Sequence, residues 1–183
     1  METKNYKKTL ITCYIGFITQ AIVANFTPLL FLRFHSEFDI PIVQIALIST
    51  VFYIVQILVD VFCAKFVDRI GYRKCVVTSQ IVSAAGLISL SFLPNLLPSR
   101  LLGILISVVI YAIGSGLIEV LVSPIVEACP FENKGSVMSL LHSFYCWGVV
   151  GVVLVSTLFF TLFGIENWRI MACLWATVPL INA

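Results

Sequence analysis

The sequence predicts an all-α protein that crosses a lipid bilayer several times. Hydrophobic residues make up 60% of the chain, and the mean hydropathy is +1.07. Charged residues make up only 11%, less than half of the roughly 25% that is usual in soluble domains. The apolar residues also occur in long runs, and a bilayer core about 30 Å thick needs roughly 20 such residues per helix.

Six apolar runs predict six membrane spans in a single bundle that covers residues 1–183. We expect them at 9–34, 41–66, 75–93, 101–126, 137–163 and 170–183. The last run holds fourteen residues, about 21 Å of helix, which is too short to cross. We therefore expect either a fragment of a longer protein or the product of a truncated gene.

The distribution of Lys and Arg predicts the orientation. The first run is longer than the roughly 7–15 apolar residues of a signal peptide, so we expect it to be retained as a span. If the N-terminus is cytoplasmic, eight basic residues face the cytoplasm and three face outward, as the positive-inside rule requires. The eight are Lys4, Lys7, Lys8, Lys65, Arg69, Arg73, Lys74 and Lys134, and the three are Arg33, Arg100 and Arg169. We expect a multi-pass protein of the cell membrane.

Several other classes of function find no support in the sequence. The net charge is only +2 and no basic patch exceeds a loop, so we expect no nucleic-acid partner. The six cysteines have no metal-ligand spacing, and we interpret them as small apolar residues rather than as a disulfide framework. Residues 114–116, Gly-Ser-Gly, follow no strand and do not form a dinucleotide-binding loop. We expect no metal, no cofactor and no enzymatic activity.

Prolines occur in two spans that would correspond if the chain consisted of two halves of three spans each. Pro28 lies in the first span and Pro124 in the fourth. Paired helix breaks of this kind are typical of inverted repeats in transporters. Two unrelated kinks are the alternative, because proline is common in membrane helices.

A short, highly charged segment lies between the second and third spans. Residues 68–74 read Asp-Arg-Ile-Gly-Tyr-Arg-Lys. Such a sequence is too polar for lipid, so we expect a tight loop at the cytoplasmic face. Taken alone, its charges could either set the topology or form contacts that change as the protein moves.

Residues 64–74 resemble the loop signature of the major facilitator superfamily, with Ala64 where that family usually has glycine. Residues 132–136 and 167–169 resemble two further turns of the same family. The resemblance implies the N-terminal six-helix half of a twelve-helix carrier, built from two inverted three-helix repeats, with the missing C-terminal half as its partner. It also implies a cytoplasmic gate, which we assign to Asp60, Asp68, Arg69, Gly71, Arg73 and Lys74.

Glu119 is a carboxyl group deep in the fourth span. A charge at the centre of a membrane helix costs on the order of 2.5–3.5 kcal/mol on insertion scales, so such a residue is expected to face a cavity and to have a function. Because desolvation disfavours the charged form of a carboxyl group, Glu119 could exchange protons at cellular pH. A permanently protonated or hydrogen-bonded glutamic acid is the structural alternative.

The motif Gly-x-Gly-x-x-Glu followed by proline, at 114–124, resembles the fourth span of fucose permease-type sugar–proton symporters. Residues 142–148, His-Ser-Phe-Tyr-Cys-Trp-Gly, are similar to the fifth span of that group. The resemblance implies that Glu119 handles sugar and protons and that His142 and Tyr145 face the substrate. That group also has an aspartate in its first span, where this chain has Asn25 and no acid, so proton stoichiometry stays open.

Four more polar or aromatic residues complete the predicted substrate site. They are Gln20 and Asn25 in the first span and Tyr53 and Gln56 in the second. Such side chains suit a sugar, whose hydroxyls need hydrogen-bond partners and whose C–H faces stack on rings. We therefore expect proton-coupled uptake of a sugar or polyol by alternating access. The alternatives are a carrier or exporter of another small solute, and a non-transporting remnant or scaffold made of half a carrier.

Overall fold

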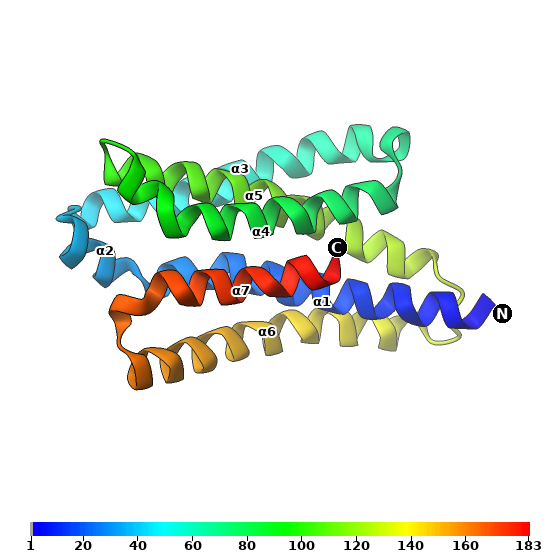
Figure 1. Ribbon diagram of the computed structural model, residues 1–183. Helices are drawn as coiled ribbons and strands as arrows, with labels where there is room; N and C mark the ends of the chain where they lie inside the picture. The colour runs from blue at the N-terminus through cyan, green and yellow to red at the C-terminus, as the bar shows by residue number, and fades with distance from the viewer. Residues whose placement is uncertain (1) are drawn as a thin grey trace.

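The structure, a computed structural model, describes residues 2–183, and it describes the side chains of all of these except residues 2–5, 64 and 68. All regular secondary structure in this range is helical, and Figure 1 shows the helices packed side by side in one elongated bundle. The elements are α1 (Glu2–Leu29), α2 (Phe31–Phe38), α3 (Ile42–Ile70), α4 (Tyr72–Leu96), α5 (Arg100–Ala128), α6 (Lys134–Phe163), the 3₁₀ turn η1 (Ile165–Asn167) and α7 (Trp168–Asn182).

Five of these helices, α1, α3, α4, α5 and α6, are long and apolar enough to cross a membrane. The chain is therefore a multi-pass membrane protein. The sixth predicted span corresponds to α7, which has 15 residues. In Figure 1 the N-terminus and the α3–α4 and α5–α6 links share one end of the bundle, here named the N-terminal end. The opposite end carries α2 and the α4–α5 and α6–α7 links, and we name it the α2 end.

The first predicted span, 9–34, is not one continuous helix. α1 ends at Leu29, a turn follows at Leu30, and α2 begins at Phe31. Pro28 lies two residues before the break and weakens the last turns of α1, because proline lacks an N–H and its ring clashes with the preceding turn. By contrast, α5 continues past Pro124 to Ala128. The two prolines therefore do not have the same effect on their helices.

The expected loop between the second and third spans is almost entirely helical. α3 runs to Ile70 and α4 begins at Tyr72, so Gly71 alone separates the two helices. Gly71 has φ +92° and ψ 133°, a conformation that only glycine adopts readily. The charges of this segment exclude it from lipid but do not prevent it from being helical, since Arg and Lys are good helix formers.

Small residues allow α4 and α5 to pack very closely. A Cβ atom at Gly86 would lie 2.5 Å from the backbone nitrogen of Tyr111, and one at Gly114 would lie 2.7 Å from the carbonyl oxygen of Ser79. Close approach at small residues is the usual means of helix association in membranes. The fully buried Tyr111 also joins α5 to α1, because its hydroxyl lies 2.7 Å from Thr27 Oγ1.

The remaining contacts place α3 and α6 on the flanks of the bundle. α1 packs along α6, and α5 packs along α3. If α1, α3 and α4 form one repeat and α5, α6 and α7 form the other, α1 corresponds to α5 and α3 corresponds to α6. The α1–α6 contact then corresponds to the α5–α3 contact, as two repeats of three spans would give. α3 and α6 also bury the smallest share of their residues among the five spans.

Hydrogen bonds and ion pairs to Glu37 connect α7 to α2 at the α2 end. The Glu37 carboxylate accepts hydrogen bonds from Arg33 Nε at 2.8 Å, Trp168 Nε1 at 2.9 Å and an Arg169 terminal nitrogen at 2.5 Å. Partial burial alone would raise the pKa of Glu37. Three neighbours outweigh this effect of burial and lower the pKa of Glu37 below its ordinary value. They are Trp168, through its hydrogen bond, Arg169, through its charge, and Arg33, through both its hydrogen bond and its charge. The Arg169 guanidinium also lies 4.8 Å from the centre of the buried Trp168 ring.

Candidate functional site

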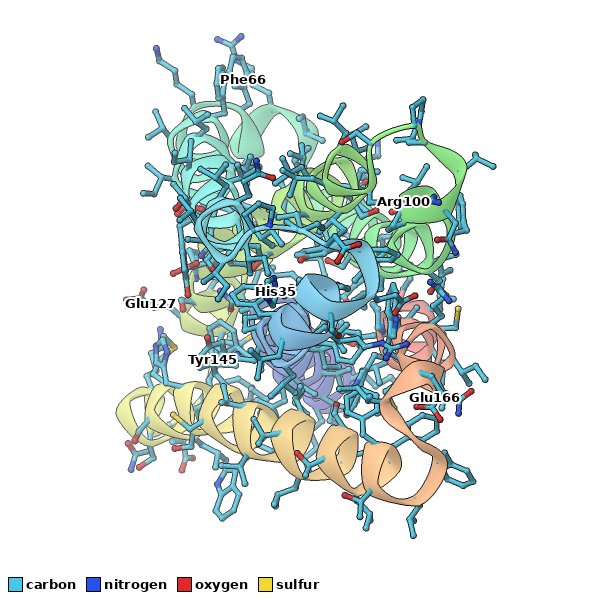
Figure 2. The ribbon with its side chains drawn as sticks, turned by 90° about the vertical axis from the view of Figure 1, so that its left-hand side faces the viewer. His35, Phe66, Arg100, Glu127, Tyr145 and Glu166 are labelled. Atoms are coloured by element: carbon cyan, nitrogen blue, oxygen red, sulfur yellow. The ribbon has the colours of Figure 1, made fainter. Side chains whose placement is uncertain are left out.

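A cavity of about 630 Å³ is bounded by α1, α3, α5 and α6. Figure 2, viewed from the α2 end, shows α3 and α6 on opposite sides of α1. The residues lining the cavity are Phe17, Gln20, Ala24, Phe52, Tyr53, Gln56, Glu119, Ser123, His142, Tyr145 and Cys146. Six of the seven residues that the sequence predicted as substrate-binding are among them.

Helical periodicity explains which residues of α1 and α3 reach the cavity. Phe17, Gln20 and Ala24 are spaced by three and four positions, and so lie on one face of α1. Phe52 and Gln56 are spaced by four on α3, with Tyr53 beside them. The ring of Phe52 meets that of Tyr53 edge-on at 5.2 Å.

Glu119 lies on the α5 wall of the cavity and is hydrogen-bonded from two other helices. Gln20 Nε2 on α1 donates to Glu119 Oε2 over 3.0 Å. Gln56 Nε2 on α3 donates to the same oxygen. Gln20 is only 7% exposed, whereas Glu119 is exposed to the open cavity. The carboxyl group can thus meet water or a solute while its direction is set by two amides.

α6 supplies the fourth wall of the cavity. His142, Tyr145 and Cys146 are spaced by three and four positions and so lie on the same face of this helix. The His142 and Tyr145 rings lie 5.4 and 6.4 Å from the ring of Phe17 on α1. Figure 2 shows Tyr145 on the side of α6 that faces the rest of the bundle. Both aromatic and polar side chains therefore line the cavity.

Asn25 is the one predicted substrate-binding residue that does not line this cavity. Its amide donates to the Ala21 carbonyl oxygen over 2.9 Å, and its side chain also interacts with Tyr145. Asn25 is five positions after Gln20, an offset that turns the helix by about 140° beyond a full circle and points the two side chains in different directions. Asn25 can therefore influence the cavity through Tyr145.

Asp60 lies apart from the other residues assigned to the gate, nine positions before Arg69 on α3. Asp60 is one helical turn from Gln56 and close enough to Glu119 to interact with it electrostatically. Its Oδ1 atom is buried and has no hydrogen-bond partner among the described residues. Arg69, Arg73 and Lys74 are exposed at the N-terminal end, on both sides of Gly71. The side chain of Asp68 lies outside the described residues.

Among the residues that the structure describes, no three His, Cys, Asp or Glu side chains are grouped so as to hold a metal ion.

Four residues that line the cavity were not among the predicted site residues and have polar or aromatic side chains. These are Phe17, Phe52, Ser123 and Cys146. Each lies three or four positions from a predicted residue, so extending the polar face of each helix by one turn would have found them.

Comparison with curated proteins gave no match. The sequence model of the Major Facilitator Superfamily, by contrast, matches residues 12–183. That range contains the cavity, the Gly71 turn and all five membrane-spanning helices except the first residues of α1. The chain belongs to the major facilitator superfamily, a family of membrane transporters.

Proposed function

We propose that this chain forms the N-terminal half of a carrier that takes up a sugar or polyol by alternating access and couples the uptake to protons through Glu119. The observation that carries the proposal is the Glu119 carboxyl group, which lies on the wall of a cavity in an apolar bundle and is held there by Gln20. A membrane helix tolerates such a group where it meets water, a solute or a partner.

The composition of the cavity supports a polyhydroxylated solute. Gln20, Gln56 and His142 offer hydrogen-bond donors and acceptors, and Phe52 and Tyr145 offer ring faces and edges. A sugar needs both kinds of contact, because its hydroxyls lose water on binding while its C–H faces remain apolar. The cavity volume of about 630 Å³ lies within the range of small-molecule sites.

The position of Glu119 supports proton coupling. An ionised carboxylate favours the two amide donors that it already has, whereas a protonated carboxyl can donate to a solute hydroxyl. Solute and proton then bind to the same group and affect each other's binding. This link is what a symporter needs.

The bundle's exposed surface supports a second half as partner. The cavity is bounded by α3 and α6, the two spans with the smallest buried share. A matching bundle packed against these helices would close the cavity and complete the carrier.

We further propose that the N-terminal end faces the cytoplasm of a plasma-membrane carrier, because the basic side chains concentrate there. Residues 69–74 and Asp60 would then contribute to a gate on that side.

The test uses the full-length carrier that contains this bundle, reconstituted in liposomes. We expect hexose, pentose or polyol counterflow, and accumulation of the same solute when the outside is acidified. Glu119→Gln should keep counterflow and lose accumulation. Glu127→Gln, which alters an exposed carboxylate outside the cavity lining, is the matched control and should keep both. Accumulation by Glu119→Gln would exclude proton coupling through this group, and absence of counterflow with every sugar and polyol would exclude the substrate class.

A further inference from the structure

One turn of α6 presents a histidine and a cysteine to the cavity. His142 and Cys146 are four positions apart on this helix, and both are exposed and line the cavity of about 630 Å³. Side chains at this spacing lie on one helix face, with Cβ atoms about 5–6 Å apart. Figure 2 shows the neighbouring Tyr145 on the side of α6 that faces the rest of the bundle. An imidazole nitrogen and a thiol sulfur can thus reach the same point in the cavity.

From this pair we propose that His142 and Cys146 form a two-ligand site for a transition-metal ion such as Zn²⁺ on the cavity wall. Imidazole nitrogen and thiolate sulfur are ligands that zinc prefers in proteins. Two ligands four positions apart on one helix face also bind zinc in the His-Glu-x-x-His motif of metalloproteases. Water or a solute oxygen completes the coordination, and the thiol proton of Cys146 passes to water when the sulfur binds the ion.

The surroundings hold both ligands in place. The His142 ring packs against the buried Phe17 of α1, with ring centroids 5.4 Å apart. The backbone of α6 is also fixed at this level, because a Cβ atom at Gly148 would lie 2.8 Å from the Cβ of Ala21 and 3.3 Å from the Cα of Ile18. An ion therefore meets ligands whose positions are set before it binds, which reduces the entropic cost of binding.

The other side chains of the cavity are compatible with a bound cation. Among the described residues that line it, Glu119 has a carboxyl group and none is Lys or Arg, so no such positive charge repels the ion. Mg²⁺ and Ca²⁺ prefer oxygen ligands, so a histidine–cysteine pair distinguishes zinc from these ions. The spacing among the cysteines alone does not reveal this pair, because its second member is a histidine.

An ion at this site competes with the solute. The proposed function assigns His142 to the solute, and a bound ion occupies the imidazole and part of the cavity beside it. We therefore expect Zn²⁺ to slow solute exchange. This consequence rests on the proposed function, whereas the metal site itself does not.

The test is the rate at which a small maleimide modifies Cys146 in the full-length carrier, with and without zinc chloride. Mass spectrometry of the modified peptide gives this rate for each cysteine separately. A thiolate that is bound to zinc is not free to react, so zinc should slow the modification of Cys146 in a saturable manner. A chelator should restore the original rate, and magnesium chloride should have no effect.

Cys173 is the control within the same molecule. It is also exposed, but no histidine lies three or four positions from it on either side. Zinc should therefore leave its modification rate unchanged. Its rate also shows whether the maleimide itself reacts with the metal.

Two variants test the histidine. His142→Ala removes the ligand, and His142→Gln removes it while keeping a polar side chain of similar size against Phe17. Loss of a ligand should cost at least the roughly 10–100-fold in metal affinity that loss of a ligand's hydrogen-bond partner costs, so half-protection of Cys146 should need that much more zinc. Rates without zinc that equal those of the parent, with Cys13 still unmodified, show that a variant is folded.

Three results would overturn the inference. They are absence of zinc protection at Cys146, equal protection of Cys146 and Cys173, and unchanged protection of Cys146 in both His142 variants, which would assign the binding to the thiol alone.

None of these measurements uses transport, so failure of the proposed function gives a different result. If zinc protects Cys146 through His142 but no sugar or polyol exchanges, the metal site stands and the substrate class falls. If exchange occurs and zinc gives no protection, the transport proposal stands and the metal site falls.

Discussion

Replacement of Glu37 by glutamine tests how the α2 end of the bundle is held together. The carboxylate accepts hydrogen bonds from Arg33, Trp168 and Arg169. Glutamine has nearly the same shape and can still accept the indole N–H of Trp168. It cannot provide the negative charge that both arginines face, so the two ion pairs are lost while the packing is kept.

The structure allows the size of the effect to be worked out. The side chains of Glu37, Arg33 and Arg169 are 17%, 27% and 34% exposed, so neither ion pair is deeply buried. Pairs of this kind contribute about 0.2–1 kcal/mol each when exposed, and hydrogen bonds to charged groups somewhat more. We expect Glu37→Gln to lower the free energy of unfolding by about 1–2 kcal/mol, or the melting temperature by roughly 2–8 °C.

A dye that fluoresces on reaction with thiols provides the assay. Cysteines that are buried in the folded protein react only after it unfolds, and the chain has four of them. They are Cys13, Cys63, Cys75 and Cys129. Glu166→Gln, at an exposed glutamate of the same end, is the control. Equal melting temperatures for Glu37→Gln and the parent at pH 7 would refute the argument that charge at Glu37 fastens α7 to α2.

The pH dependence follows from the lowered pKa of Glu37. A carboxyl whose pKa is lower when folded stabilises the protein above its unfolded value, here 4.5, and this contribution is lost as the pH falls through the folded value. The difference between parent and Glu37→Gln should therefore be constant from pH 7 to about 5 and should shrink below 4.5.

Three further predictions concern packing and access. Gly86→Ala should destabilise the protein by about 1–3 kcal/mol, because the new methyl group would meet the Tyr111 backbone, whereas Gly151→Ala, with no atom within 4 Å, should be neutral or stabilising by up to about 1 kcal/mol in the same melting assay. Tyr111→Phe should cost about 1 kcal/mol, since it leaves the buried hydroxyl of Thr27 without its 2.7 Å partner. Cys146 lines the cavity and is exposed, so a small maleimide should label it in the folded protein, and a transported solute should slow this labelling, as mass spectrometry of the modified peptide would show.

The membrane class and the family were predictable from the sequence because they depend on features that are local in the chain. Long apolar runs give spans, and the motif at 64–74 is contiguous. Helix ends were less predictable. The charges around Gly71 suggested a loop, yet the segment is helical on both sides of that residue, because charge determines where a helix can lie and not whether it forms.

The site depends on how helices are rotated about their axes, and this is set by packing rather than by local sequence. Glu119 was recognisable because a carboxyl group in an apolar run is costly. The sequence did not predict that Gln20 and Gln56 both reach the same carboxylate oxygen of Glu119. Asp60, which the sequence predicts to belong to a gate, lies one turn from Gln56 and within electrostatic reach of Glu119, a proximity that the sequence did not predict.

The glycine contacts between α4 and α5 have a mechanical consequence. The backbones of α4 and α5 approach each other closely at Gly86 and Gly114, so these helices cannot slide or roll past each other without a steric clash. The two helices therefore form a rigid pair. α3 packs mainly on α5 and α6 mainly on α1, and these two spans bury the smallest share of their residues. The close α4–α5 contact therefore gives Glu119, which lies on α5, a rigid support on the cavity wall.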